Sequence, residues 1–258
     1  MSLLFSHGFF SGIIPGMKKF FSWLLSIFVW LFVAVDTLGA FLTIALLKPF
    51  DPDQKISYRV ANLWGRLIVQ SNPMWKVKIS GRSHIKKNKG YVLVANHSSL
   101  ADIVILYCLG KHFKWISKES LFKIPFFGWT MSLLRYISLR RGEHGSIRDT
   151  LREAQEWLEK DISVLIFPEG TRSRTGDLGE FKNGAFKIAI RTGKPLIPIV
   201  ITGTNKAISK GEAMMTAKVE GSIKVLPAID VSSYKPEDYK ILKANVRELM
   251  EKELASLS

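Results

Sequence analysis

The chain has 258 residues, 47% of them hydrophobic, and this length and composition suit one sizeable folded domain and exclude a predominantly disordered chain. A single cysteine, Cys108, excludes a disulfide framework and a cysteine-rich zinc site. The formal net charge of +15 would attract nucleic acid, anionic lipid or a phosphorylated substrate, and charge alone does not choose among them.

The N-terminal part of the chain contains a long apolar run. Residues 1–16 are expected to be an extension, because Met17 and the lysines after it resemble a natural start. From Phe20 to Leu47 the only ionisable residue is Asp36, and as a helix this run would reach roughly 42 Å, more than a bilayer core requires. We therefore expect a membrane-embedded helix. The alternative is a buried core helix, but such helices are rarely apolar on all sides over this length.

A second, amphipathic helix is predicted from Lys55 to Gln70. Its apolar face comprises Ile56, Val60, Leu63, Trp64 and Leu67. Residues 17–72 are therefore predicted to form a membrane-associated two-helix segment, although a surface helix on a soluble domain is an alternative for the second helix. Lysines flank the first helix on both sides, so the positive-inside rule does not choose between a helix that spans the bilayer and one inserted into a single leaflet with both ends in the cytosol.

Residues 73–258 are predicted to form an α/β domain around a central sheet. Short apolar runs typical of buried strands alternate with helical patterns in this part of the chain. Strands are expected at Val92–Ala95, Ser163–Phe167 and Leu196–Thr202. Helices are expected at Leu100–Leu109, Ile147–Lys160, Glu180–Thr192 and from Pro236 to Ser256, the third ended by Gly193.

The first candidate catalytic motif is Asn96-His97-Ser98-Ser99-Leu100-Ala101-Asp102, where a buried strand ends and a helix begins. Catalytic groups often follow the carboxyl ends of strands in α/β folds. His97 is expected to deprotonate an acceptor hydroxyl that attacks a thioester carbonyl, and Asp102 would hold the imidazole in the right tautomer. The alternative is an ordinary helix N-terminus, in which Ser98 or Ser99 is the cap and Asp102 is a first-turn acid.

The second motif, Phe167-Pro168-Glu169-Gly170-Thr171-Arg172-Ser173-Arg174, also follows a buried strand. Gly170 allows close approach of the backbone to a ligand, and Arg172 and Arg174 are forked donors suited to a phosphate. Glu169 is expected to orient an arginine or a substrate hydroxyl. An ordinary polar turn with solvated arginines is the alternative.

Between these motifs, Lys118 is a candidate second phosphate ligand, and the apolar stretch that follows it is expected to line an acyl chain, contact lipid or form a core loop. Arg140 and Arg141 add positive charge near the same site. Cys108 is expected to be a buried helix residue, and His112 and His144 are expected on the surface. No group of residues has zinc-ligand spacing, so neither a metal nor a cofactor is expected.

Four segments in order, covering roughly residues 91–202, resemble the conserved blocks of one family. They are the HX4D pair of His97 and Asp102, Lys118–Gly128, the Phe-Pro-Glu-Gly-Thr-Arg-Ser-Arg signature matched at every position, and Lys194–Val200. The chain is thereby similar to bacterial 1-acyl-sn-glycerol-3-phosphate acyltransferases of the glycerolipid HX4D family. The resemblance implies a mixed β-sheet flanked by helices, His97 and Asp102 as catalytic residues, and Lys118, Glu169, Gly170, Thr171 and Arg172 as substrate-binding residues.

The expected reaction is transfer of a fatty acyl group from acyl-CoA or acyl carrier protein to the sn-2 hydroxyl of lysophosphatidic acid, at the cytoplasmic face of the inner membrane. Within the enzyme class, glycerol 3-phosphate or another lysolipid is the alternative acceptor. In other classes, a membrane-tethered protein that binds nucleic acid or anionic lipid would not need the His–Asp pair, and intact blocks argue against an inactive scaffold. We expect membrane lipid as a partner and no nucleic acid.

Overall fold

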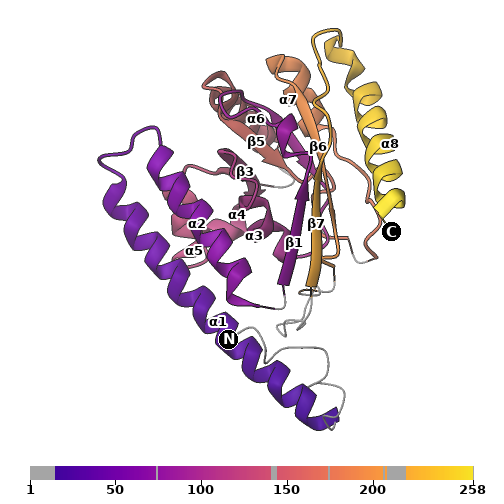
Figure 1. Ribbon diagram of the computed structural model, residues 1–258. Coiled ribbons are helices and arrows are strands. Elements are labelled where there is room, and N and C mark those ends of the chain that lie inside the picture. Colours follow the sequence, from indigo (N-terminus) through magenta and orange to yellow (C-terminus); the bar gives the residue numbers. More distant parts are fainter. Residues whose placement is uncertain are drawn as a thin grey trace.

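The computed structural model describes residues 15–73, 75–140, 144–173, 175–205, 207 and 219–257. They form a seven-stranded mixed sheet in the order β1-β7-β6-β2-β5-β3-β4 (Figure 1). The strands are β1 (Trp75–Ser80), β2 (Val92–Ala95), β3 (Phe113–Lys118), β4 (Ile137–Leu139), β5 (Ser163–Ile166), β6 (Leu196–Thr202) and β7 (Val219–Val225). All neighbouring strands are parallel except β6 and β7, so β1 and β7 run opposite to the others. The predicted α/β fold with a central mixed sheet is confirmed.

The centre of the sheet is buried on both faces, as expected for parallel strands. In β2, Leu93 and Ala95 pack into one hydrophobic cluster, whereas Val92 and Val94 pack into another on the opposite face. This alternation follows from the two-residue period of a strand. The apolar runs of β2, β5 and β6 are uninterrupted because alternate residues of each strand pack into the hydrophobic clusters on opposite faces of the sheet.

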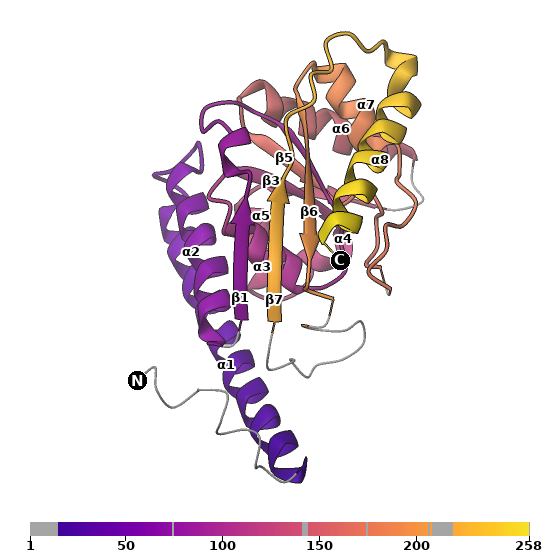
Figure 2. The same ribbon diagram turned by 45° about the vertical axis from the view of Figure 1, so that its right-hand side comes forward.

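Helices cover both faces (Figures 1 and 2). One face carries α3 (Ala101–Tyr107), α4 (Glu119–Phe122) and α5 (Phe127–Leu133), with α1 (Pro15–Leu47) and α2 (Lys55–Ser71) outside them. The other face carries α6 (His144–Glu159), α7 (Gly184–Thr192) and α8 (Tyr239–Leu257). Two short 3₁₀ helices, Arg82–His84 and Pro236–Asp238, complete the described elements.

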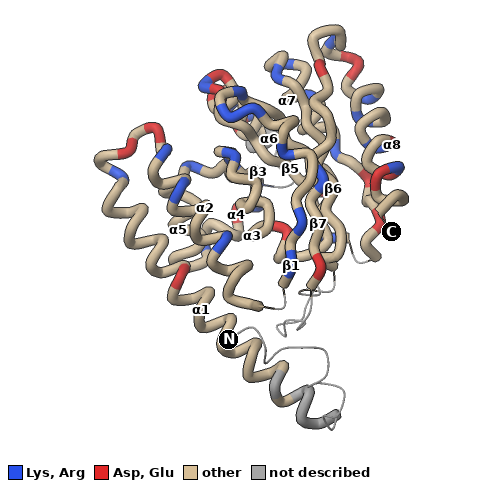
Figure 3. The backbone as a smooth tube through the Cα atoms, viewed as in Figure 1, with Lys and Arg blue, Asp and Glu red and all other residues tan. Residues whose placement is uncertain are grey.

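The two predicted N-terminal helices are confirmed as α1 and α2, which form a hairpin along one side of the molecule (Figure 1). Ser22–Leu47 has the length and hydropathy to cross a membrane, and only 11% of its most apolar window is buried. In Figure 3, α1 is almost free of charge, whereas Lys and Arg are spread over α2 and the α/β domain. Exposed apolar side chains in a continuous row favour contact with lipid rather than water.

The hairpin nevertheless packs tightly on the α/β domain. Val29, Ile44 and Ile68 belong to the same hydrophobic cluster as the sheet residues Leu93 and Ile199. The role of residues 17–72 as a unit distinct from residues 73–258 stays a prediction, and any test of it must respect this shared core.

Two contacts fix the position of α2. A Cβ atom at Gly65 would lie 2.6 Å from Cβ of Tyr107, so only glycine allows α2 to approach α3 this closely. Before α2, the buried ammonium of Lys114 donates to the side chain of Gln54 and to the carbonyl of Leu134 at 2.7 Å. Burial lowers the pKa of Lys114 to about 7.

Two predictions of local structure require correction. Helix α7 begins at Gly184 rather than Glu180, because the preceding residues form a loop in which Lys182 N–H donates to the carbonyl of Pro168 at 2.7 Å. His112 is not a surface residue. Its ring stacks on Tyr58 at 4.3 Å between centroids, and burial lowers its pKa to about 3. Cys108 is half-buried at the end of α3.

Candidate active site

The two sequence motifs lie side by side at the carboxyl ends of adjacent parallel strands. Val94 of β2 pairs with Ile166 of β5, so Asn96-His97 and Phe167-Pro168-Glu169 leave the sheet at the same edge. His97 Nδ1 lies 2.8 Å from Asp102 Oδ2, and its side chain is 13% exposed. With Nδ1 engaged by the carboxylate, Nε2 is the ring nitrogen left to meet a substrate.

Asp102 is completely buried, and each of its oxygens is hydrogen-bonded. Oδ2 accepts the backbone N–H groups of Ser98 and Ser99 at 2.7 and 2.9 Å in addition to the His97 ring, and Oδ1 accepts the hydroxyl of Thr204 at 2.5 Å. The helix-terminus alternative is therefore partly right, because Asp102 satisfies the free amides before α3. The same carboxylate also holds the imidazole, so the two roles coincide in one residue.

His97 is held through its backbone as well as its ring. Its N–H donates to Glu169 Oε1 at 2.9 Å, and its carbonyl accepts the N–H of Ser173 at 2.8 Å. The ring stacks on Phe167, with centroids 3.9 Å apart and planes 9° from parallel. These contacts from the second motif leave the imidazole little rotational freedom, which is the preorganisation that a general base needs.

Glu169 spans the two motif loops. While Oε1 accepts from His97, Oε2 accepts the N–H of Gly179 at 2.8 Å. Burial raises the pKa of Glu169 above its ordinary value, and the two backbone donors oppose this rise. The hydrogen bonds that this carboxylate accepts from His97 and Gly179 are thus with the protein backbone, and its predicted role in binding substrate stays a prediction.

The sequence did not identify Thr204 as a neighbour of the site, and it did not reveal the structural role of Asn96. Thr204 follows β6 and reaches Asp102, and its only sequence signal is its place just after a buried strand. Asn96 was part of the motif, but its structural role emerges only here, since its amide exchanges two hydrogen bonds with the backbone of Ile201 at 2.7 and 2.8 Å. Both residues fasten the β2 loop to β6.

A cavity of about 1460 Å³ adjoins His97. Its apolar wall is formed by residues of α1, α2, α3 and α5, including Val33, Trp64, Val104 and Met131. The predicted binding residues Lys118, Gly170, Thr171 and Arg172 line the same cavity, with Glu169. The structure therefore places the predicted site residues around one mostly apolar space with cations at its polar part, except Asp102, which is buried behind His97.

The other basic residues predicted near the site are Arg140, Arg141 and Arg174. Arg140 is exposed and forms an ion pair with Glu119 at 3.2 Å between Nε and Oε1. Arg141 and Arg174 lie outside the described residues. Among the ranges that the structure describes, no three His, Cys, Asp or Glu side chains gather as a metal site, and the expectation that no metal is needed stays a prediction.

Comparisons with known proteins show which proteins the chain resembles. Residues 76–202 match the family model described as Acyltransferase. The chain is 31% identical over 219 residues to the 1-acyl-sn-glycerol-3-phosphate acyltransferase of Escherichia coli. This match covers 82% of this chain and 84% of the Escherichia coli protein. It is 42% identical over 164 residues to a chloroplastic 1-acyl-sn-glycerol-3-phosphate acyltransferase of Arabidopsis thaliana, covering 63% of this chain.

The match spans only 46% of that plant protein, so this chain covers about half of its length. Among solved structures, the 1-acyl-sn-glycerophosphate acyltransferase of Thermotoga maritima superimposes with a TM-score of 0.81 at 27% identity. That similarity covers 93% of this chain and 98% of the other, so it includes the N-terminal hairpin as well as the α/β domain.

The geometry predicts that His97 and Asp102 carry the chemistry of the site. His97→Ala should lower kcat at least about 100-fold, because general-base assistance is worth roughly 10²–10⁴-fold. Asp102→Asn should also lose much activity, since a neutral amide does not stabilise the imidazolium and does not hold the imidazole in the right tautomer. Steady-state kinetics on purified variants with wild-type circular dichroism would measure this.

The matched control is His84→Ala, which removes an exposed histidine bonded to the carbonyl of Val225. It should leave kcat unchanged. If His97→Ala retains more than about a tenth of the wild-type rate, the general-base role is wrong.

Proposed function

Because the chain belongs to the glycerolipid acyltransferase family, we propose that it transfers a fatty acyl group to the sn-2 hydroxyl of 1-acyl-glycerol 3-phosphate, giving phosphatidic acid. The observation that carries this proposal is the His97–Asp102 pair at the edge of a large apolar cavity that also contains Lys118 and Arg172. The acyl donor is acyl-CoA or acyl carrier protein, both of which present the chain as a thioester.

The proposed reaction needs one proton carrier. Nε2 of His97 removes the proton of the sn-2 hydroxyl, and the oxygen attacks the thioester carbonyl. The new C–O ester bond forms, the C–S bond breaks, and the departing sulfur receives the proton from the imidazolium. Asp102 stabilises that imidazolium through the 2.8 Å contact with Nδ1. Each proton and leaving group is accounted for, so neither a metal nor a cofactor is part of the proposal.

The cavity suits an amphipathic acceptor. Its long apolar wall offers burial worth about 0.8 kcal/mol per methylene, whereas Lys118 and Arg172 offer charge to a phosphate. A nucleic acid has no long apolar chain that could be buried against this wall. The combination favours a lysophospholipid over glycerol 3-phosphate, which has no acyl chain.

We also propose that α1 lies in the membrane and places the cavity beside it, at the cytoplasmic face where the soluble thioester donors are found. Exposed apolar residues along α1 include Phe28 at 57% and Leu31 and Val35 at 63% each. Phe126 and Trp129 of the α5 region are also exposed and contact Phe41 of α1, which extends the apolar surface toward the cavity. An acceptor could then reach His97 from the bilayer without passing through water.

The test is an assay of the purified protein with lysophosphatidic acid, glycerol 3-phosphate and lysophosphatidylcholine, each with acyl-CoA and with acyl carrier protein. We expect turnover of lysophosphatidic acid well above the other acceptors and no effect of EDTA. Preference for another acceptor would replace the proposed substrate. EDTA inhibition reversed by one divalent ion would contradict the absence of a metal.

Arg172 is predicted to bind the acceptor phosphate. Arg172→Ala should raise the acceptor KM roughly 10- to 100-fold, the range expected for a lost charge-assisted hydrogen bond, and should change the donor KM much less. Arg172→Lys should rescue poorly, because an ammonium group cannot reproduce the guanidinium fork. The control Arg191→Ala removes an exposed cation at the far end of α7. A defect confined to the donor KM would assign Arg172 to donor binding.

The exposed face of α1 is predicted to serve membrane access rather than chemistry. The triple variant Phe28→Gln, Leu31→Gln and Val35→Gln keeps the shared core intact, and it should release much of the protein from vesicles. Activity on a long-chain lysolipid in vesicles should fall roughly 10-fold or more, because access now requires transfer through water. Activity on a short-chain, water-soluble acceptor should be retained.

The control for this experiment is Ile241→Gln with Leu249→Gln, which changes exposed apolar residues of α8 on the other face of the molecule. It should leave vesicle binding unchanged. An equal loss on both acceptors in the α1 variant would mean that this face helps to build the active site.

A further inference from the structure

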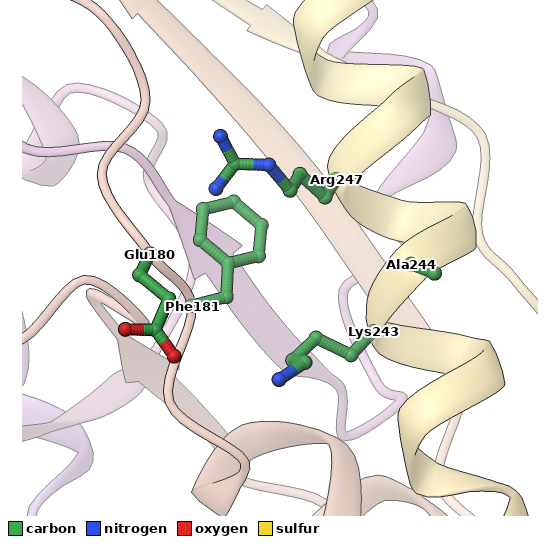
Figure 4. Close-up of a pocket in the computed structure, with 5 residues that line it drawn as sticks. All are labelled: Glu180, Phe181, Lys243, Ala244 and Arg247. Carbon is green, nitrogen blue, oxygen red and sulfur yellow. The ribbon is translucent and has the colours of Figure 1, made fainter.

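Arg247 of the C-terminal helix is bound to the loop that precedes α7. Its guanidinium donates from Nη1 to the carbonyl of Gly179 and from Nη2 to the carbonyl of Leu178 at 3.1 Å. Figure 4 shows Arg247 reaching from α8 over the ring of Phe181, with the guanidinium carbon 5.5 Å from the ring centroid. Glu251, one turn along α8, adds an ion pair at 2.8 Å.

The peptide unit between Leu178 and Gly179 links this arginine to the active site. Its carbonyl accepts from Arg247, and its N–H donates to Glu169 Oε2 at 2.8 Å. In a trans peptide the carbonyl and the N–H point in opposite directions from one rigid plane. Fixing the carbonyl therefore fixes the direction of the N–H, and Arg247 determines how that N–H meets Glu169.

Glu169 passes the constraint to His97. Its other oxygen accepts the His97 N–H at 2.9 Å, and the carboxylate is buried, with 6% of the residue exposed. A Cβ at Gly179 would lie 2.9 Å from Oε2, so the loop is already in closest contact with the carboxylate. Loss of one of its two hydrogen-bond donors would leave an oxygen of this buried carboxylate unsatisfied, which costs free energy. The carboxylate would then move toward a new donor, and this movement would displace the backbone of His97.

We propose that Arg247 is a positioning residue for the acyl transfer, acting through the 178–179 peptide and Glu169 on the placement of His97. The proposal rests on the proposed function for its kinetic consequences. Arg247 does not itself line the cavity, although Gly179, whose carbonyl it binds, does. Because the predicted phosphate ligands Lys118 and Arg172 lie elsewhere on the cavity wall, loss of Arg247 should affect the geometry of the base more than the binding of substrate. Small displacements of a catalytic group have large effects on rate.

The experiment compares Arg247→Ala and Arg247→Lys with the control Lys252→Ala, which removes an exposed cation from the same helix. Arg247→Ala should lower kcat roughly 10-fold with the acceptor KM changed less than about twofold. Arg247→Lys keeps the packing over Phe181 and one donor, so it should recover part of kcat. The control should match the wild type. A kcat for Arg247→Ala within twofold of wild type would overturn the proposal.

A double-mutant cycle separates positioning from a general structural effect. If Arg247 acts through Glu169, Arg247→Ala should have little further effect on kcat in a Glu169→Gln background. Additive losses would show that Arg247 supports the fold by another route and would overturn the proposal. Should Arg247→Ala fail to fold, the same cycle is made with Arg247→Lys.

Amide hydrogen exchange gives a readout that does not require activity. Peptides that contain His97 and Gly179 should exchange faster in Arg247→Ala than in the wild type, while peptides of β3 should not change. Unchanged exchange at both sites would overturn the proposal. If the wild type transfers acyl groups to none of the acceptors tested, the proposed function fails, and the exchange measurement still decides whether Arg247 orders the His97 loop.

Discussion

The buried carboxylate of Asp102 is the group on which the geometry of the site depends. A charge without access to water needs hydrogen bonds to both oxygens, and here the donors come from the β2 loop and from Thr204 beyond β6. Satisfying one anion thus draws two strand ends and α3 to a common point. The imidazole of His97 is one of these donors, so the requirement that stabilises the loop also orients the base.

A second carboxylate, Glu169, extends this arrangement to the next strand. It binds the backbone of His97 and of Gly179, while the carbonyl of His97 is bound by Ser173. The imidazole is therefore supported by the carboxylate of Asp102 at the start of α3, by the β5 loop and by the ring of Phe167. Asp102 and Glu169 therefore hold His97 in place, and direct contact with a substrate is left to the residues that line the cavity.

The sequence predicted the elements with the strongest patterns. The continuous apolar runs of β2, β5 and β6 identified the buried strands, because burial on two faces leaves little room for polar residues. The uninterrupted apolar run of α1 and the helical spacing of the apolar residues in α2 identified the hairpin. β4 has only three residues, too few for a periodic signal. The start of α7 was predicted too early, because residues 180–183 have helical composition although the N–H of Lys182 is bound to the carbonyl of Pro168.

His112 was predicted on the surface because its stacking on Tyr58 is a tertiary contact, which a sequence pattern does not show. The motif residues of the site were predictable, whereas Thr204 and Arg247 reach it from distant parts of the chain.

The close approach of α2 to α3 at Gly65 connects the helical hairpin with the wall of the cavity. Tyr107, which Gly65 contacts, also lines the cavity and bonds the hydroxyl of Tyr136 at 2.7 Å. The helices that meet the bilayer therefore also form a wall of the space that would hold an acyl chain. Under the proposed function, a substitution in the hairpin would change both the surface that faces the bilayer and the shape of the cavity that receives the chain. If the proposed function holds, adaptation of the hairpin to a bilayer of different composition would also reshape the space that holds the substrates from which that bilayer is built.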